Sequence, residues 1–91
     1  RQESLEEHKA FIDSLRLDLV VSKIIKGSRK DATFLIETEL VQLNHTSVTK
    51  TSKTVQENDI ISIRKKGRFK ILNTQKTSKK GKIILIYGKF I

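Results

Sequence analysis

The sequence predicts an α+β fold in which a hairpin of two helices packs on a small, mostly antiparallel sheet of four to five strands. Two observations support this prediction. Apolar residues recur at helical spacing in the first half of the chain, and short apolar runs separated by turn residues fill the second half. The 91 residues provide enough length for one domain with one hydrophobic core.

The first helix is predicted from an apolar stripe that begins at residue 17. Its members follow the i, i+3, i+4, i+7, i+8 spacing of one helical face, and Gly27 gives a stop signal just beyond them. The stripe consists of Leu17, Val20, Val21, Ile24 and Ile25.

The second helix is predicted to start at Ser28, which has Asp31 three residues later, as in a capping box. Its apolar positions are Ala32, Leu35 and Ile36. Arg29 and Lys30 then fall in the first turn, where exposed backbone N–H groups and the helix dipole favour a bound anion. Taken alone, this pair is explained equally well as two solvated surface cations.

Five short strands are predicted after the helices, each bounded by turn residues. They cover residues 40–44, 47–50, 60–64, 68–73 and 82–90. The run over residues 83–87 is apolar at every position, which predicts a strand that is central in the sheet or covered on both faces.

Residues 1–14 are acidic and polar, and the chain contains no Met. We therefore expect this stretch to be a linker from an upstream region, with a short helix or an extended segment in it. The domain itself is expected over residues 15–91, with residues 64–91 as a basic hairpin extension.

The charge is distributed unevenly along the chain. Residues 1–59 carry nine Lys and Arg against ten Asp and Glu, whereas residues 60–91 carry ten Lys and Arg and no acidic residue. The whole net charge of +9 therefore comes from the last third of the chain. A folded domain with such a region favours a polyanion as its partner, and an anionic membrane or an acidic protein is the alternative.

The sequence contains no pattern typical of a catalytic or metal site. The two histidines, His8 and His45, lie far apart in the sequence, and neither a phosphate-binding loop nor a nucleophile-elbow motif occurs. We expect no enzyme activity, no metal and no cofactor. The absence of Cys, of a signal peptide and of an apolar run long enough for a membrane span predicts a soluble, cytoplasmic chain.

Residues 16–63 resemble the small RNA-binding domain named after ribosomal protein S-four, also called the αL motif. The family's R-L-D opening and S-R-x-x-A-x-x-L-I helix start both occur, followed by its strand end, a K-x-S and a D-x-I-like ending. The matching positions are Arg16, Leu17, Asp18, Ser28, Arg29, Ala32, Leu35, Ile36, Val41, Leu43, Asn44, Lys50, Ser52, Asp59 and Ile60. The chain departs from the pattern at four positions, since Glu39, His45 and Asn58 replace glycines and Thr51 replaces a proline.

The C-terminal part is similar to the extension that closes bacterial YlmH-type proteins, on the basis of the GRFK and TSKKGK segments. This resemblance implies a cytoplasmic RNA-binding protein with ribosomal RNA or the ribosome as partner, and a link to cell division. Because most of the five aromatic residues are expected in the core, RNA recognition should follow shape more than base stacking.

The candidate RNA-binding residues form two sets. The family resemblance implies phosphate binding by Arg29 and Lys50, with Arg16, Lys30 and Lys53 nearby. The basic extension adds Arg64, Lys65, Lys66, Arg68, Lys70, Lys76, Lys79, Lys80 and Lys82. Two other functions fit the same residues, namely an interaction module for acidic proteins or anionic membranes, and an accessory domain that directs an upstream RNA-modifying enzyme to its RNA.

Overall fold

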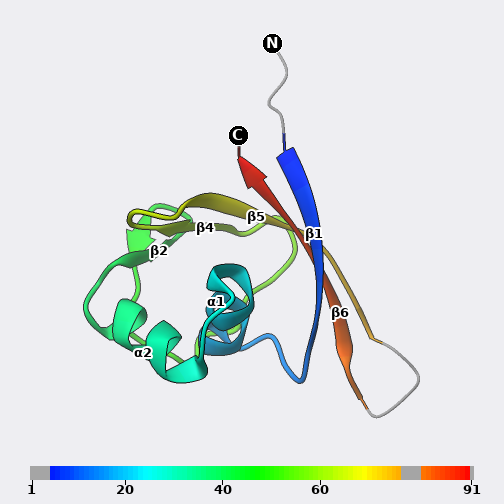
Figure 1. The fold of residues 1–91 in the computed structure, drawn as a ribbon, viewed down its shortest axis with the longest axis horizontal. Helices are drawn as coiled ribbons and strands as arrows, with labels where there is room; N and C mark the ends of the chain where they lie inside the picture. The colour runs from blue at the N-terminus through cyan, green and yellow to red at the C-terminus, as the bar shows by residue number, and fades with distance from the viewer. Residues whose placement is uncertain (1–4, 77–80, 91) are drawn as a thin grey trace.

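The computed structural model describes residues 5–76 and 81–90, and in this part of the chain a six-stranded antiparallel sheet curves around two helices (Figure 1). This confirms the predicted α+β class, with more strands than the four to five expected. In chain order the elements are β1 (Leu5–Ile12), α1 (Leu17–Ile25), α2 (Arg29–Glu37), β2 (Val41–Leu43), β3 (Thr46–Ser47), β4 (Ile60–Ile63), β5 (Gly67–Lys76) and β6 (Ile83–Phe90).

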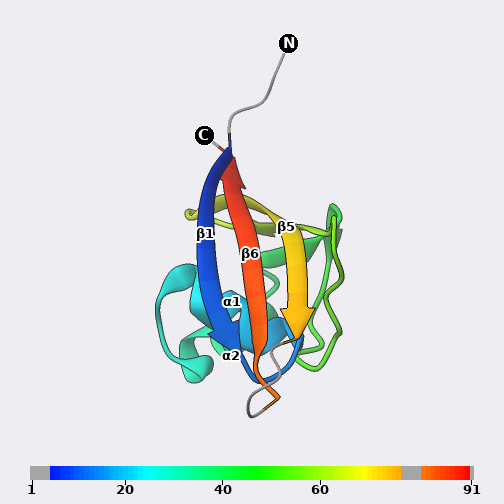
Figure 2. The ribbon, with the colours of Figure 1, turned by 90° about the vertical axis from the view of Figure 1, so that its right-hand side faces the viewer.

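The two helices have the caps and faces that their sequences indicate. In α1, the predicted stripe is buried except for Ile25, which is half-buried. At the start of α2, the N–H of Asp31 donates to Ser28 Oγ at 3.0 Å, and the N–H of Ser28 donates back to Asp31 Oδ2 at 3.4 Å. The predicted capping box is therefore present, and both helices lie on the same side of the sheet (Figures 1 and 2).

The sheet has the strand order β1-β6-β5-β4-β2-β3, and every pair is antiparallel. Strand β5 joins two parts of the sheet, β4-β2-β3 on one side and β1-β6 on the other. Its first residues pair with β4, and nearly its whole length pairs with β6. A register shift between Ile71 and Asn73 interrupts the β5–β6 ladder. Such a bulge bends and twists a strand, which lets one continuous sheet wrap around α1.

The prediction for the apolar run over residues 83–87 holds for its place in the sheet, because β6 lies between β1 and β5. Ile83, Leu85 and Tyr87 are buried on the side of the helices. Ile84 and Ile86 are only half-buried, since no helix covers the opposite face (Figure 2). This strand is thus central by its hydrogen bonds and covered on one face.

Residues 5–12 differ from the linker expected over residues 1–14. They form β1, which pairs with β6 over its full length, from Leu5 opposite Phe90 to Ile12 opposite Ile83. The physical reason is that β6 would otherwise expose an unpaired row of backbone N–H and C=O groups along an apolar strand. Ile12, at only 2% exposed, closes this end of the core.

The role of β1 in stability can be tested with two neighbouring substitutions. Ile12→Ala should lower the free energy of unfolding by about 2–4 kcal/mol, because it opens a cavity in the core. Phe11→Ala, on the same strand but at a side chain that is 52% exposed, should cost less than about 1 kcal/mol. Urea unfolding of both variants measures this, and equal small losses would mean that residues 5–12 do not belong to the folded unit.

Candidate nucleic-acid interface

The buried carboxylate of Asp18 organises the start of α1. It is only 2% exposed, and its Oδ2 accepts hydrogen bonds from Arg16 Nη2 at 3.2 Å and from Arg29 Nε at 3.0 Å. Its Oδ1 accepts from the N–H of Leu19 at 2.8 Å. One buried carboxylate therefore holds two guanidinium groups that come from different elements.

The tight connection between the helices brings Arg29 to this position. Lys26 at the end of α1 has the left-handed φ of +57°, and α2 begins three residues later. The chain therefore reverses at once, so that the first residue of α2 reaches back to Asp18, eleven residues earlier in the sequence.

The segment over residues 50–55 also runs along the start of α1. The N–H of Leu17 donates to the carbonyl of Lys53 at 2.8 Å, and that of Asp18 donates to the carbonyl of Thr51 at 3.1 Å. Arg16 forms an isolated β-bridge with Thr54. These carbonyls satisfy N–H groups of the first turn of α1, which has no side-chain cap.

Two of the predicted cations, Arg16 and Arg29, thus bond to one carboxylate, and the segment that carries Lys50 and Lys53 lies against the same turn; we call this group the Asp18 cluster. It consists of Arg16, Asp18, Arg29, Lys50 and Lys53. The Arg16 and Arg29 side chains are 41% and 54% exposed, and both lysines are exposed. Because the negative charge is buried and the positive charges reach solvent, the surface of the cluster is positive.

Lys30 follows Arg29 in the first turn of α2 and is exposed. Among the ion pairs of residues 5–76 and 81–90 it has no partner. Lys30 is therefore a solvated cation that directly follows the cluster residue Arg29 in the sequence.

The basic extension does not form one continuous surface. Arg64, Lys65 and Lys66 lie at the β4–β5 turn, and Lys82 lies beyond the other end of β5, a strand of ten residues that spans about 33 Å at 3.3 Å per residue. Arg68 and Lys70 alternate with the buried Phe69, so they lie on the sheet face away from the helices. The guanidinium carbon of Arg68 lies 5.1 Å from the centre of the Phe90 ring.

The remaining predicted cations lie at the end of the β5–β6 hairpin. Lys79, Lys80 and the Lys76 side chain fall outside the described part of the structure. The Nζ atom of Lys82 lies 2.6 Å from Asp13 Oδ1, and this contact lowers the pKa of Asp13 below its ordinary value of 3.8. Lys82 thus has an acidic neighbour that the sequence prediction did not anticipate.

In the sequence, Asp18 is recognisable only as part of the R-L-D motif, and its role as the centre of the cluster was not predicted. A usable signal existed, because an acidic residue in the first turn of an otherwise apolar helix needs a partner if it is buried. Its partners could not be read from the sequence, since Arg29 and residues 50–55 approach it only through the tertiary fold.

Comparison with protein-family models and with curated protein sequences finds no match to this chain. In the described residues, no helix is long and apolar enough to cross a membrane. The same residues contain no group of three or more His, Cys, Asp or Glu side chains placed to hold a metal ion.

The structural importance of Asp18 can be tested by replacing its charge. Asp18→Asn should lower the free energy of unfolding by about 1–3 kcal/mol, because two guanidinium groups lose their charged acceptor. The loss stays below that of a fully buried ion pair, since both arginines are partly screened by solvent. Asp31→Asn, at the exposed capping box, is the matched control and should cost about 1 kcal/mol or less. Equal losses in thermal unfolding would contradict the central role of Asp18.

The contact between Lys82 and Asp13 can be tested by titration. Because the folded-state pKa of Asp13 is lowered, the contact is intact above pH 3.8 and is lost as the pH falls through the folded-state pKa. Lys82→Gln should raise the pKa of Asp13 more than Lys23→Gln does, since Lys82 contributes both a hydrogen bond and charge whereas Lys23 contributes only weaker charge. NMR titration of the Asp13 carboxyl carbon measures this, and an opposite order would disprove the assignment.

Proposed function

We propose that this chain is an S-four-type, non-catalytic module that binds structured RNA through the Asp18 cluster. One observation carries the proposal: Arg16 and Arg29, from the starts of α1 and α2, bond to one buried carboxylate, and the backbone of residues 51–53 bonds to the same turn. The family resemblance implies phosphate binding by Arg29 and Lys50, with Arg16, Lys30 and Lys53 nearby.

The geometry of Arg29 suits a bidentate phosphate contact. Its Nε donates to Asp18, which fixes the plane of the guanidinium group. Within the described residues, its two terminal nitrogens make no hydrogen bond. A guanidinium held in this way is already oriented, so little side-chain entropy is lost when a phosphate binds.

Backbone geometry gives further support to the resemblance. At the three positions where the family usually has glycine, Glu39, His45 and Asn58 have φ angles of +63°, +70° and +73°. These residues therefore adopt the left-handed conformation that glycine adopts most easily. The expected turns are kept although the glycines are absent.

The wider assignment follows from the same proposal. We propose a cytoplasmic protein whose partner is ribosomal RNA or the ribosome, with a link to cell division. An accessory role for an upstream RNA-modifying enzyme uses the same surface. Docking on an acidic protein or an anionic membrane is the competing outcome of the tests below.

The proposal predicts that Arg29→Lys weakens binding to a hairpin-rich ribosomal RNA fragment by about tenfold. A lysine ammonium cannot bond to Asp18 and also make a two-point phosphate contact. The double change Lys50→Gln with Lys53→Gln leaves both Asp18 ion pairs intact and should weaken binding by a similar factor. Fluorescence anisotropy at moderate salt measures both effects.

Lys23→Gln is the matched control, because it removes one exposed positive charge from α1 outside the cluster. The affinity for RNA should fall with salt by about 0.7–0.9 log units per log unit of salt for each phosphate contact. Equal weakening by the control, or equal competition by anionic vesicles, would reject the Asp18 cluster as an RNA site.

A further inference from the structure

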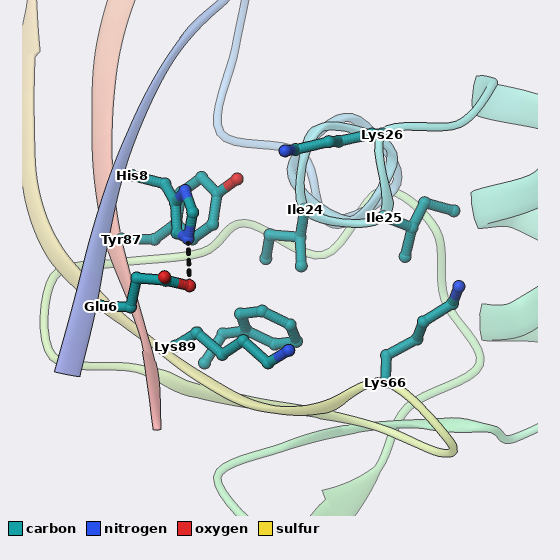
Figure 3. Close-up of a pocket in the computed structure, with 9 residues that line it drawn as sticks. Glu6, His8, Ile24, Ile25, Lys26, Lys66, Tyr87 and Lys89 are labelled. Carbon is teal, nitrogen blue, oxygen red and sulfur yellow. Dashed lines mark hydrogen bonds and ion pairs between the residues drawn. The ribbon is translucent and has the colours of Figure 1, made fainter. Parts of the chain in front are cut away.

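A second group of cations surrounds a pocket at the other end of α1. The pocket has a volume of about 260 Å³ and lies between the end of α1, the β4–β5 turn and strands β1 and β6 (Figure 3). Its lining residues are Glu6, His8, Ile24, Ile25, Lys26, Lys66, Phe69, Tyr87 and Lys89. Of its three lysines, only Lys66 was predicted from the sequence as a binding residue.

The three lysines reach this pocket from three separate elements, as Figure 3 shows: Lys26 from the end of α1, Lys66 from the turn before β5 and Lys89 from β6. In the described part of the chain, no carboxylate lies within ion-pair distance of any of them. Three like charges around one hollow repel each other, so an anion in the pocket would stabilise the arrangement.

Lys89 gives the clearest indication that the three lysines of the pocket are more than solvated surface cations. Its cross-strand partner is Glu6, a pair that would ordinarily form a salt bridge. Instead, Glu6 Oε1 accepts a hydrogen bond at 3.1 Å from Nε2 of His8, which also stacks on Tyr87 with 5.3 Å between ring centres. One oxygen of Glu6 is thus bonded to His8, and in the described residues no ion pair joins Glu6 to Lys89.

Lys26 is the one cation of the pocket whose position has another physical explanation. A lysine at a helix C-terminus is favoured by the helix dipole, which explains this one cation without a ligand. However, Lys26 has a left-handed φ of +57°, and Gly or Asn would adopt this backbone conformation at a lower energetic cost than Lys does. The dipole explanation does not extend to Lys66 and Lys89, which lie on other elements.

The net charge of the pocket is positive. The three lysines carry three positive charges. The opposing charges are the one negative charge of Glu6 and the roughly −0.5 elementary charge of the helix dipole at the C-terminus of α1. Burial raises the pKa of Tyr87 above its ordinary value of 10, so its phenol is neutral at pH 7. The floor is apolar, since it is formed by Ile24, Ile25 and the Phe69 and Tyr87 rings.

We propose that this pocket binds one phosphate group of a nucleotide, which the positive charge of the three lysines attracts, with the apolar floor contacting the nucleoside. At about 260 Å³ the pocket lies below the roughly 300–1,000 Å³ of sites for drug-sized ligands, so it can enclose part of one nucleotide and not an extended strand. The phosphate can come from a free nucleotide or from the 5′ end of an RNA. The proposal does not depend on what the Asp18 cluster binds.

The test is an NMR titration of the whole chain with adenosine 5′-monophosphate and, separately, with inorganic phosphate at low ionic strength. Saturable shifts are expected at the amides of Lys26, Lys66 and Lys89, with tighter binding of the nucleotide because only it reaches the apolar floor. Lys66→Gln and Lys89→Gln should each weaken nucleotide binding at least threefold, and together at least tenfold. Lys26→Asn removes the third charge with a residue that tolerates positive φ.

Two controls separate this site from the Asp18 cluster. Lys23→Gln removes a charge from the last turn of α1 outside the pocket, and Arg29→Ala disrupts the Asp18 cluster; neither should change nucleotide binding. Loss of binding in either control, or no saturable shift with any probe, would overturn the proposal. A hairpin RNA with a 5′-phosphate, compared with the same RNA carrying a 5′-hydroxyl, identifies the source: a preference for the phosphorylated form assigns the pocket to RNA ends, and none assigns it to free nucleotides.

Discussion

The arrangement of this small domain depends on the burial of one carboxylate at the start of α1. An isolated buried charge is strongly unfavourable, so Asp18 requires cationic partners, and Arg16 and Arg29 provide them. The bond to Arg29 ties α2 to α1, while backbone bonds from Leu17 and Asp18 tie residues 50–53 to the same place. The same interactions that stabilise the helix pair therefore hold Arg16 and Arg29 together and bring the segment that carries Lys50 and Lys53 beside them.

The sheet provides the rigid support on which these helices rest. The bulge between Ile71 and Asn73 lets β5 serve both halves of the sheet, and β1 completes the edge beside β6. Helix α1 therefore has a cationic group at each end. The Asp18 cluster lies at its start, and the pocket lined by Lys26, Lys66 and Lys89 lies at its end. Nine residues, about 13 Å of helix, separate them, so a ligand at one site need not affect the other.

Much of the fold could be predicted because its signals are local. The spacing of Leu17, Val20 and Val21 and the capping box at Ser28 need only neighbouring residues, and both are confirmed. The strand at residues 5–12 could not be predicted, since its mixed polar sequence becomes a strand only because β6 needs a partner. The grouping of the basic residues could not be predicted either. Residues 64–82 are continuous in the sequence, but in the fold the length of β5 separates the cations at its two ends.

In our proposal, the Asp18 cluster, and not the basic extension, makes the primary contact with structured RNA. Chemical-shift mapping of the whole chain with a hairpin-rich RNA tests this most directly. We expect the largest changes at residues 16–18, 28–30 and 50–54, with the Arg29 Nε–H signal still protected by Asp18. Changes confined to residues 64–70 and 81–84 would contradict it.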